Sequence, residues 1–281
     1  MQRIPVITVI MGVYNTRDVK RLGSSINSVL NQTFEDFEII ICDDCSDKYY
    51  IKEYLRDMSN QDGRIKIIEN RRNIGLAASL NRCIEESSPD SKYIFRQDDD
   101  DLSEPVRFKL QYDFLESNPN VSIVGSNISL YDDNGKWGNL TYPEKPEKKD
   151  FLFTVPFMHG AIAFRKDDLI KSGCYLSSKE TNRTEDYELL MRMYSLGYTG
   201  CNLQEELYSF REDLEAHKRR KYRYRIDEAR IRYKGFKMLN MLPQGLPYII
   251  KPLIVGIIPY NLLNFMKDKY YGRRREYTPN T

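Results

Sequence analysis

Four consecutive aspartates, Asp98–Asp101, stand out in this sequence as side chains placed to do chemistry. They follow a short apolar run, and like charges this close repel one another and raise one another's pKa. Carboxylate oxygens are hard ligands that suit Mg²⁺ or Mn²⁺, and these ions usually share their coordination with substrate phosphates. We therefore expect the run to hold a divalent metal ion that neutralises the charge of a departing diphosphate.

A second pair of acids, Glu185 and Asp186, opens a segment whose apolar residues recur at helical spacing. One of them could act as a general base, because a hydroxyl nucleophile needs a base within hydrogen-bonding reach of its proton. The pair could instead stabilise the positive end of the helix dipole. The pattern alone leaves both interpretations open.

The elements that must position these acids form an alternation of strand and helix patterns along the first half of the chain. This order predicts a doubly wound α/β sheet with right-handed crossovers. The unbroken apolar run 37–41 is typical of a strand buried on both faces of a parallel sheet. The expected strands are 6–10, 37–41, 65–68, 93–95 and 121–124, and the expected helices are 18–31, 51–58, 74–84 and 104–116.

The last of these helices carries a clear start signal. Ser103 is placed to cap it, and Pro105 falls in its first turn. Val106, Leu110 and Phe114 recur four residues apart, so we expect them to form its buried face.

Polar residues follow four of the expected strands. In sheets of this class, ligands bind beyond the carboxyl ends of the strands, so these residues should gather on one rim. A single Asp-Asp pair is more typical of a turn, but Asp43 and Asp44 at one strand end and the acidic run at another indicate a site. The chain has no GxxxxGK[ST] loop and no GxGxxG after the first strand, which argues against a P-loop NTPase and against dinucleotide binding.

Charge is distributed unevenly between the two ends of the chain. Residues 1–215 carry a net charge of −10, whereas residues 216–281 carry +12. An acidic body with a basic tail indicates that the two parts face different partners. The five cysteines are irregularly spaced, so we expect reduced thiols and a cytosolic setting, and no signal peptide is visible.

The tail combines basic runs with an apolar segment. "HKRRKYRYR" at 217–225 precedes "LPYIIKPLIVGIIPYNLLNFM" at 246–266, and "RRR" follows at 273–275. The apolar segment is long enough to span a bilayer, but a lysine, three prolines and two asparagines interrupt it. We expect a helix pair in the membrane interface rather than a spanning helix, with packing onto the body as a third option. Nucleic-acid binding is not expected, since no reader motif accompanies the basic run.

Five stretches in a fixed order resemble the family 2 glycosyltransferases, whose fold is named GT-A. They are "VITVIMGVYN", "SVLNQTFEDFEIIICDDCSD", "NRRNIGLAASLN", "YIFRQDDDDLSEPVRFKLQ" and "TEDYELLMR", and together they cover roughly residues 4–215. The resemblance implies a Rossmann-like mixed sheet flanked by helices, with a catalytic domain at 1–215. Residues 216–281 would be a basic and apolar helical extension that associates with the membrane.

The resemblance also implies roles for residues at the strand ends. Six residues would bind the nucleotide sugar: Tyr14 at the base, Asp43 and Asp44 at the base or ribose, and Arg72, Asn73 and Gly75 along the nucleotide. Asp98 and Asp100 match the DxD pair, with Asp100 as the direct metal ligand and Asp98 nearer the sugar or ribose. Asp186 matches the catalytic base.

Three further residues would lie on the acceptor or diphosphate side: His159, Glu185 and Arg211. His159 could equally be a satisfied histidine at a strand start. Arg211 could merely pair with Glu212 or Asp213 at the surface.

The sequence departs from the family pattern at several positions. Cys45 stands where glycine is common in "DDGS", Gly12 replaces a common proline, and Cys83 sits where glycine is frequent. Asp99 replaces a small residue, which makes the register of the DxD pair less certain. No QxxRW motif follows Asp186, which argues against a processive polymerase of the cellulose-synthase type.

The resemblance implies an inverting transfer of a hexose from a UDP-sugar to a hydroxyl of an undecaprenyl-diphosphate-linked saccharide, forming a β linkage. Mn²⁺ or Mg²⁺ would be the cofactor. The protein would lie peripherally on the cytoplasmic face of a bacterial inner membrane, attracted by anionic lipid, in O-antigen, capsule or exopolysaccharide assembly. A sugar-1-phosphate nucleotidyltransferase would need a Gly-rich, basic loop after the first strand, which "GVYNTRDVKRLG" lacks. A non-catalytic nucleotide-sugar-binding protein would have lost Asp186 or the DxD pair, and both are present.

Overall fold

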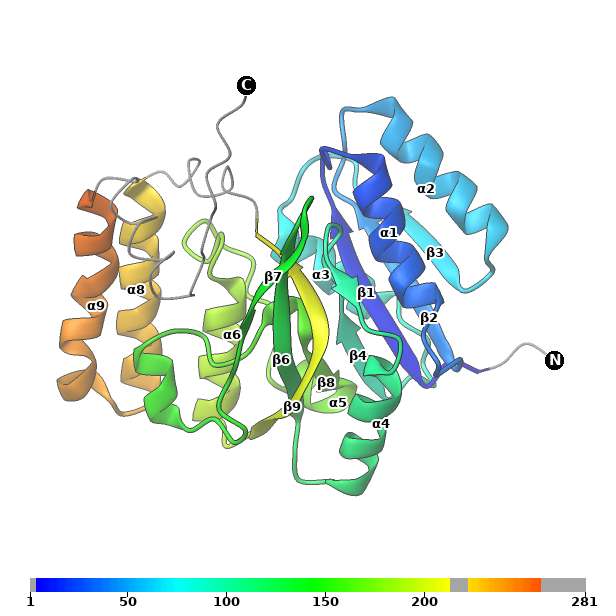
Figure 1. Ribbon diagram of the computed structural model, residues 1–281. Coiled ribbons are helices and arrows are strands. Elements are labelled where there is room, and N and C mark those ends of the chain that lie inside the picture. Colours follow the sequence, from blue (N-terminus) through cyan, green and yellow to red (C-terminus); the bar gives the residue numbers. More distant parts are fainter. Residues whose placement is uncertain (1–3, 213–221, 259–281) are drawn as a thin grey trace.

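The computed structural model describes residues 4–212 and 222–258 (Figure 1). Within these ranges nine strands form one sheet, in the order β3-β2-β1-β4-β8-β6-β9-β5, with β7 paired to β6. The strands are β1 Ile7–Val13, β2 Phe37–Asp43, β3 Ile65–Glu69, β4 Tyr93–Arg96, β5 Leu102–Ser103, β6 Ile123–Asp132, β7 Gly135–Leu140, β8 Ala163–Arg165 and β9 Gly200–Arg211.

Helices cover both faces of this sheet. The helices are α1 Val19–Leu30, α2 Tyr49–Gln61, α3 Leu76–Glu85, α4 Arg107–Ser117, α5 Lys166–Lys171, α6 Glu185–Ser195, α8 Tyr222–Met238 and α9 Leu242–Ile257, with 3₁₀ turns η1 Lys148–Leu152 and η2 His159–Ala161. Apolar residues of α1, α2 and α4 share one core with one face of the sheet. Those of α3, α6 and α8 share a second core with the other face.

The half of the sheet that carries the predicted strand ends is parallel. Strands β3, β2, β1 and β4 pair in parallel, and Val13 of β1 lies opposite Asp43 of β2. Residues Ile39, Ile40 and Ile41 are fully buried, as expected for a strand covered on both faces. The first four strands and the helices between them are therefore confirmed.

The other half of the sheet is mixed. β8 runs antiparallel to β4 and β6, while the long strands β6 and β9 run parallel to each other. The fifth predicted strand, 121–124, is only the beginning of β6. The doubly wound arrangement expected from the series of strands and helices therefore holds for the parallel half, and the other half has the mixed strand directions that the resemblance implies.

The predicted start and buried face of α4 are wrong. The helix begins at Arg107, and Ser103 belongs to β5. Val106 is exposed, and the buried positions are Arg107, Phe108, Gln111 and Leu115. The buried face is partly polar because Arg107 and Gln111 enter a hydrogen-bond network beneath the acidic run.

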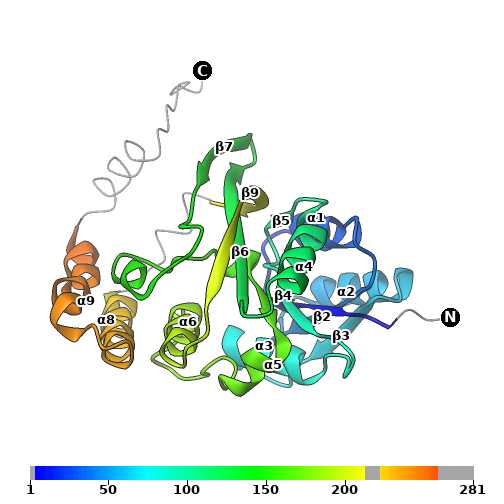
Figure 2. The same ribbon diagram turned by 90° about the horizontal axis from the view of Figure 1, so that it is seen from below.

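The helices α6, α8 and α9 stand side by side at one end of the molecule, with α9 outermost (Figures 1 and 2). Two close contacts, one between α8 and α6 and one between α9 and α8, hold these helices together. A Cβ at Gly235 would lie 2.2 Å from Met191 Sδ of α6, and one at Gly245 would lie 2.4 Å from the Phe236 ring. A Cβ at Gly245 would clash with the Phe236 ring, and one at Gly235 would force the Met191 side chain to move. The composition boundary expected at residue 215 therefore does not interrupt the packing, because α8 shares the core of α6.

The tail predictions fall partly outside the described residues. Residues 217–221, 259–266 and 273–275 lie there, whereas the described part of the apolar segment belongs to α9. No helix among residues 4–212 and 222–258 combines the length and the hydropathy that crossing a bilayer requires.

Candidate active site

The predicted strand-end residues do meet at one rim. The Asp44 amide donates to the Val13 carbonyl over 2.8 Å, which places the end of β2 beside the end of β1. The Ser25 hydroxyl of α1 donates to the Asp98 carbonyl over 2.6 Å, which fastens the acidic run at the same edge. Tyr14 follows β1 and is 47% exposed, so its ring is open to a ligand.

Asp44 holds the loop that precedes α3. Its Oδ1 accepts from Asn70 Nδ2 at 2.7 Å and from the Ile74 amide at 2.8 Å, and its Oδ2 accepts from the Gly75 amide at 2.8 Å. Gly75 has φ +88°, which a side chain would strain. The Asp44 carboxylate thus shapes the surface that presents Arg72 and Asn73, both of which are exposed.

Asp43 is buried and keeps one oxygen available. Its Oδ1 accepts from the Ser46 amide at 3.1 Å. Its Oδ2 has no hydrogen-bond partner among the described residues, although the side chain is fully buried. A buried acceptor without a donor is costly in a folded protein, so this oxygen is suited to a ligand donor group. Cys45 follows with φ +62°, a backbone conformation that favours glycine, and this fits the glycine that the resemblance leads one to expect at this position.

The four acids of the run have different surroundings. The fully buried Arg96 reaches Oδ1 of Asp98 at 2.5 Å. Asp101 is fully buried and accepts from the Tyr208 hydroxyl at 2.9 Å and from the Arg211 amide at 2.7 Å, so it is a structural residue. Asp98, Asp99 and Asp100 remain half-buried. Burial and the charges of Asp100 and Asp98 raise the pKa of Asp99 to about 7.

Asp186 and Glu185 form the first turn of α6. Asp186 Oδ1 accepts from the Tyr187 amide at 2.7 Å. Burial, with a smaller contribution from the charge of Asp98, raises the pKa of Asp186 to about 6. Burial and the charge of Asp186 raise the pKa of Glu185 to about 7. The candidate base Asp186 therefore lies close enough to the acidic run for the charge of Asp98 to affect its pKa.

His159 opens η2, beside the acidic run. Its Nε2 is 2.9 Å from the Tyr175 hydroxyl. Burial, aided by the charge of Arg96, lowers the pKa of His159 to about 3, so its ring is neutral at physiological pH. A Cβ at the next residue, Gly160, would lie 2.8 Å from Oδ2 of Asp98, so only glycine lets η2 approach the acidic run this closely.

Tyr175 is a site residue that the sequence analysis missed. It lies between α5 and α6, and Asn81 fixes its backbone through bonds of 2.8 and 3.0 Å. Burial raises the pKa of its hydroxyl, and Asp186, Glu185 and Asp98 add to the effect. No local pattern in the sequence marks this tyrosine, because its position depends on a contact with α3.

Arg211 ends β9 and pairs with an acid that was not among its expected partners. Its guanidinium contacts Asp133 in the β6–β7 turn and lies 5.4 Å from the Tyr131 ring centre. Its side chain is almost fully buried, whereas Asp133 is largely exposed. A role of Arg211 at the diphosphate stays a prediction.

The donor set of the acidic run fits a hard divalent cation. Among the residues that the structure describes, no group of three or more histidine, cysteine, aspartate or glutamate side chains is arranged to hold a metal. Mg²⁺ and Mn²⁺ sites of nucleotide enzymes commonly use one or two carboxylates and complete the shell with water and phosphate oxygens. Asp98 and Asp100 can supply two such carboxylates. A cation would also relieve the repulsion that raises the pKa of Asp99.

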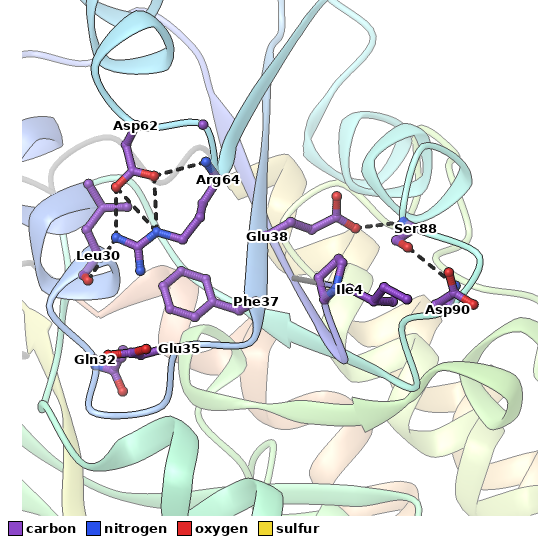
Figure 3. A pocket seen from close by; sticks show the side chains of 12 residues that line it. Ile4, Leu30, Gln32, Glu35, Phe37, Glu38, Asp62, Arg64, Ser88 and Asp90 are labelled. Atoms are coloured by element: carbon purple, nitrogen blue, oxygen red, sulfur yellow. Dashed lines mark hydrogen bonds and ion pairs between the residues drawn. The ribbon is translucent and has the colours of Figure 1, made fainter. Parts of the chain in front are cut away.

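Two pockets lie at opposite edges of the sheet. One of about 530 Å³ adjoins the acids of α6 and is lined by the start of α3, the loop 177–182, Glu185 and Arg223. The other, of about 850 Å³, lies at the amino ends of β1–β3 and is shown in Figure 3. There Arg64 pairs with Asp62, and Glu38 accepts from the Ser88 amide (Figure 3). The first pocket is on the carboxyl edge, where sheets of this class bind ligands.

Comparison with known proteins agrees with this geometry. Residues 8–173 match the family described as "Glycosyl transferase family 2". A protein of Bacillus subtilis (strain 168) named glycosyltransferase EpsE is 37% identical over 272 residues, which cover 97% of this chain and 96% of that protein. The UDP-Gal:alpha-D-GlcNAc-diphosphoundecaprenol beta-1,3-galactosyltransferase of Escherichia coli is 25% identical, over 96% of this chain and 98% of its own.

A solved structure shares the fold. The mannosyltransferase PcManGT of Pyrobaculum calidifontis, in complex with GDP-Man and Mn²⁺, superposes with a TM-score of 0.60 and 16% identity, over 97% of this chain and 82% of its own. The mixed sheet is therefore a GT-A fold, as the resemblance implied. The family match covers more than half of the chain, and it coincides with the rim built from Asp43, the acidic run and the loop before α3. The chain belongs to glycosyl transferase family 2 and is a glycosyltransferase.

Proposed function

We propose that the protein is an inverting glycosyltransferase that moves a hexose from a UDP-sugar to a hydroxyl of a lipid-linked glycan and forms a β linkage. The observation that carries the proposal is the placement of Asp186. It sits at the start of α6, partly shielded from water, at a site where the charge of Asp98 affects its pKa. A one-step displacement needs a single base on the acceptor side and, on the other side, carboxylates that would hold the metal ion of the diphosphate leaving group.

Asp186 is suited to be the base. A pKa of about 6 leaves its carboxylate mostly ionised at neutral pH, yet basic enough to accept a proton. Asp186 takes the proton of the acceptor hydroxyl as that oxygen bonds to the anomeric carbon. The bond from this carbon to the diphosphate oxygen breaks, and its electron pair leaves with the nucleoside diphosphate. Attack opposite the leaving group converts an α-linked donor into a β-linked product.

The nucleotide would lie along the carboxyl rim. Tyr14 would flank the base, and the free oxygen of Asp43 would accept a hydrogen bond from the base or ribose. Asp44 would act largely through the loop that it holds, which presents Arg72, Asn73 and Gly75 to the nucleotide.

Asp98 and Asp100 would hold the divalent metal ion. Mn²⁺ or Mg²⁺ bound there would neutralise charge on the diphosphate. The buried Arg96 fixes the Asp98 carboxylate in place, and His159, neutral and bonded to Tyr175, lines the acceptor side without adding charge.

The acceptor is proposed to be an undecaprenyl-diphosphate-linked saccharide, in O-antigen, capsule or exopolysaccharide assembly on the cytoplasmic face of a bacterial inner membrane. The pocket of about 530 Å³ supports this choice, since Lys179 and Arg223 line it near Glu185 and could pair with a diphosphate. The E. coli relative, whose name specifies a diphosphoundecaprenol acceptor, adds support because the two chains align over nearly their whole lengths.

A donor and acceptor screen tests the proposal. The full-length protein is incubated with Mn²⁺, a panel of UDP- and GDP-sugars, and undecaprenyl-diphosphate-GlcNAc, and the product anomer is assigned by NMR. We expect transfer from one UDP-hexose with inversion. A product of retained configuration, transfer only from a GDP-sugar, or no transfer to this lipid-linked acceptor would each contradict it. Formation of a nucleotide sugar from a nucleoside triphosphate and a sugar 1-phosphate would identify a nucleotidyltransferase instead.

A further inference from the structure

The outward face of α9 carries a continuous row of apolar side chains. Pro243, Pro247, Ile250, Ile254 and Ile257 are all exposed within the described structure and recur every three or four residues, so they form one stripe along the helix. We call these five residues the α9 stripe. Ile250 is 52% exposed, Ile254 57% and Ile257 74%. A surface helix of a globular protein normally has polar residues on this side.

An apolar groove continues the stripe toward α8. This groove has a volume of about 510 Å³ and is lined mostly by apolar side chains: Tyr222, Ile226, Ala229 and Tyr233 of α8, and Ile249 and Leu253 of α9. Leu246, beside the stripe, is 54% exposed. The apolar surface therefore extends across both helices, and contiguous patches of this kind usually mark an interaction site.

The charges that border this surface are positive. Lys251 is the one charged residue of α9. On α8, Asp227 is buried and Glu228 is half-buried, and both pair with arginines of the same helix, Arg230 at 3.1 Å and Arg232 at 3.1 Å. Arg230 and Lys234 line the groove, where Lys234 pairs with Glu180, and Lys237 is exposed further along α8. The hairpin thus presents apolar side chains flanked by cations.

We propose that the α9 stripe is the surface by which the protein lies on an anionic lipid bilayer. An amphipathic helix with an apolar face and flanking Lys and Arg is bound in this way, with the apolar face at the boundary of headgroups and acyl chains. A second copy of the chain is a poorer match, because an isologous contact through this face would bring the same cations together. This inference does not depend on the proposed reaction, since no residue of the α9 stripe lines the pocket beside Glu185.

The stripe is linked to the active site through packed helices. α9 touches α8 at Gly245 and Phe236, and α8 touches α6 at Gly235 and Met191. Arg232 of α8 also lies 5.0 Å from the ring centre of Tyr187, the residue after Asp186. A bilayer that holds α9 would therefore fix the orientation of α6 relative to the membrane, where a lipid-linked acceptor resides.

Vesicle flotation of the full-length protein tests this inference. The vesicles contain phosphatidylglycerol and phosphatidylcholine, or phosphatidylcholine alone, at low ionic strength. The triple variant Ile250→Gln, Ile254→Gln and Ile257→Gln should lower partitioning onto the anionic vesicles by ~100-fold, given the transfer free energy of buried isoleucine side chains. Glutamine has a higher helix propensity than isoleucine, so the variant should keep α9 helical. The matched control replaces three exposed apolar residues elsewhere, Ile4, Val106 and Ile170, by glutamine and should bind as the parent does.

Four outcomes would overturn the inference. The parent protein could fail to bind anionic vesicles, or could bind phosphatidylcholine alone equally well. Removal of residues 259–281 could abolish binding while the triple variant retains it, which would make that segment the anchor. The parent could dimerise through the stripe, with the triple variant monomeric and equally able to bind vesicles. Donor hydrolysis, measured in parallel, should stay unchanged in the triple variant and reports on the reaction separately.

A depth measurement gives a second, independent readout. Ile254→Trp should show fluorescence quenched by brominated lipids in anionic vesicles, whereas Ile170→Trp in the same background should not. Equal quenching in the two variants would contradict insertion of the stripe.

Discussion

The hydroxyl of Tyr208 donates a 2.9 Å hydrogen bond to Oδ2 of Asp101, and this bond ties the last carboxylate of the acidic run to strand β9. Asp101 is fully buried and also accepts from the Arg211 amide, so both of its oxygens are occupied. Its pKa is raised well above the ordinary value by burial and by the charges of Asp98 and Asp100. This leaves Asp98, Asp99 and Asp100 as the acids that could face a metal ion, and the choice of Asp98 and Asp100 among them stays a prediction from the resemblance.

Removing the Tyr208 hydroxyl should destabilise the protein. Tyr208→Phe leaves a buried carboxyl oxygen without its donor, which costs about 1–3 kcal/mol of unfolding free energy. Urea unfolding followed by circular dichroism measures this loss. Tyr233→Phe on the exposed side of α8 is the control and should change stability by less than about 0.5 kcal/mol. Equal effects of the two substitutions would contradict a structural role for Asp101.

Glu185 should make stability depend on pH. Its folded-state pKa of about 7 lies above the ordinary 4.5, so the native state keeps the proton that the unfolded chain releases. The stability from Glu185 is therefore complete below the unfolded pKa and is lost as the pH rises through the folded pKa. Glu185→Gln should be more stable than the parent by about 1–3 kcal/mol near pH 8 and no more stable near pH 4. Thermal unfolding at both pH values checks this, with exposed Glu53→Gln as control; a difference independent of pH would argue against it.

Cys45 should be a source of strain. Its φ of +62° lies in the left-handed region, which costs a residue with a Cβ roughly 1–2 kcal/mol. Cys45→Gly should raise the unfolding free energy by about 0.5–1 kcal/mol, since glycine's flexibility in the unfolded chain offsets part of the gain. Cys45→Ala keeps a Cβ and should bring no gain. If alanine stabilised as much as glycine, the effect would come from the thiol and not from the backbone.

The metal hypothesis predicts a large loss when Asp100 is neutralised. Asp100→Asn should lower turnover by at least ~100-fold, the scale of losing one electrostatic stabiliser. EDTA should abolish activity, and Mn²⁺ or Mg²⁺ should restore it. Asp113→Asn on exposed α4 serves as the control for a lost surface charge. Full activity in EDTA would contradict the hypothesis that the acidic run binds a catalytic metal ion.

The parallel half of the fold could be predicted because its signals are local. Strand β2 is an unbroken apolar run, and α1 and α3 repeat apolar residues at helical spacing. Local patterns could not predict the strand pairing of the mixed half, which was expected only from the resemblance. The pairing of β6 with β9 joins residues about eighty positions apart, and its register shifts between Ser126 and Ile128. The helix α4 was predicted, but its buried face was not, because Arg107 is buried and donates to Ser103 Oγ and the Arg96 carbonyl. An apolar pattern cannot reveal such a polar face.

The candidate site was predicted to a similar extent. The strand-end rule brought Asp43, Asp44 and the acidic run to one rim, and the structure confirms that placement. The hydrogen bonds that the Asp44 carboxylate accepts from the chain before α3 could not be predicted. They depend on three donors that come together only in the folded chain. Tyr175 was missed for the same reason.

The most direct test of the central claim is transfer by Asp186→Asn compared with its binding of UDP. Asparagine keeps the shape of the side chain and removes its basicity, so donor binding by calorimetry should stay near that of the parent. Transfer from the UDP-sugar to the lipid-linked acceptor should fall by ~100-fold or more, the range of general-base loss. Lost UDP binding with unchanged transfer per bound donor would contradict the account and assign Asp186 to the nucleotide site.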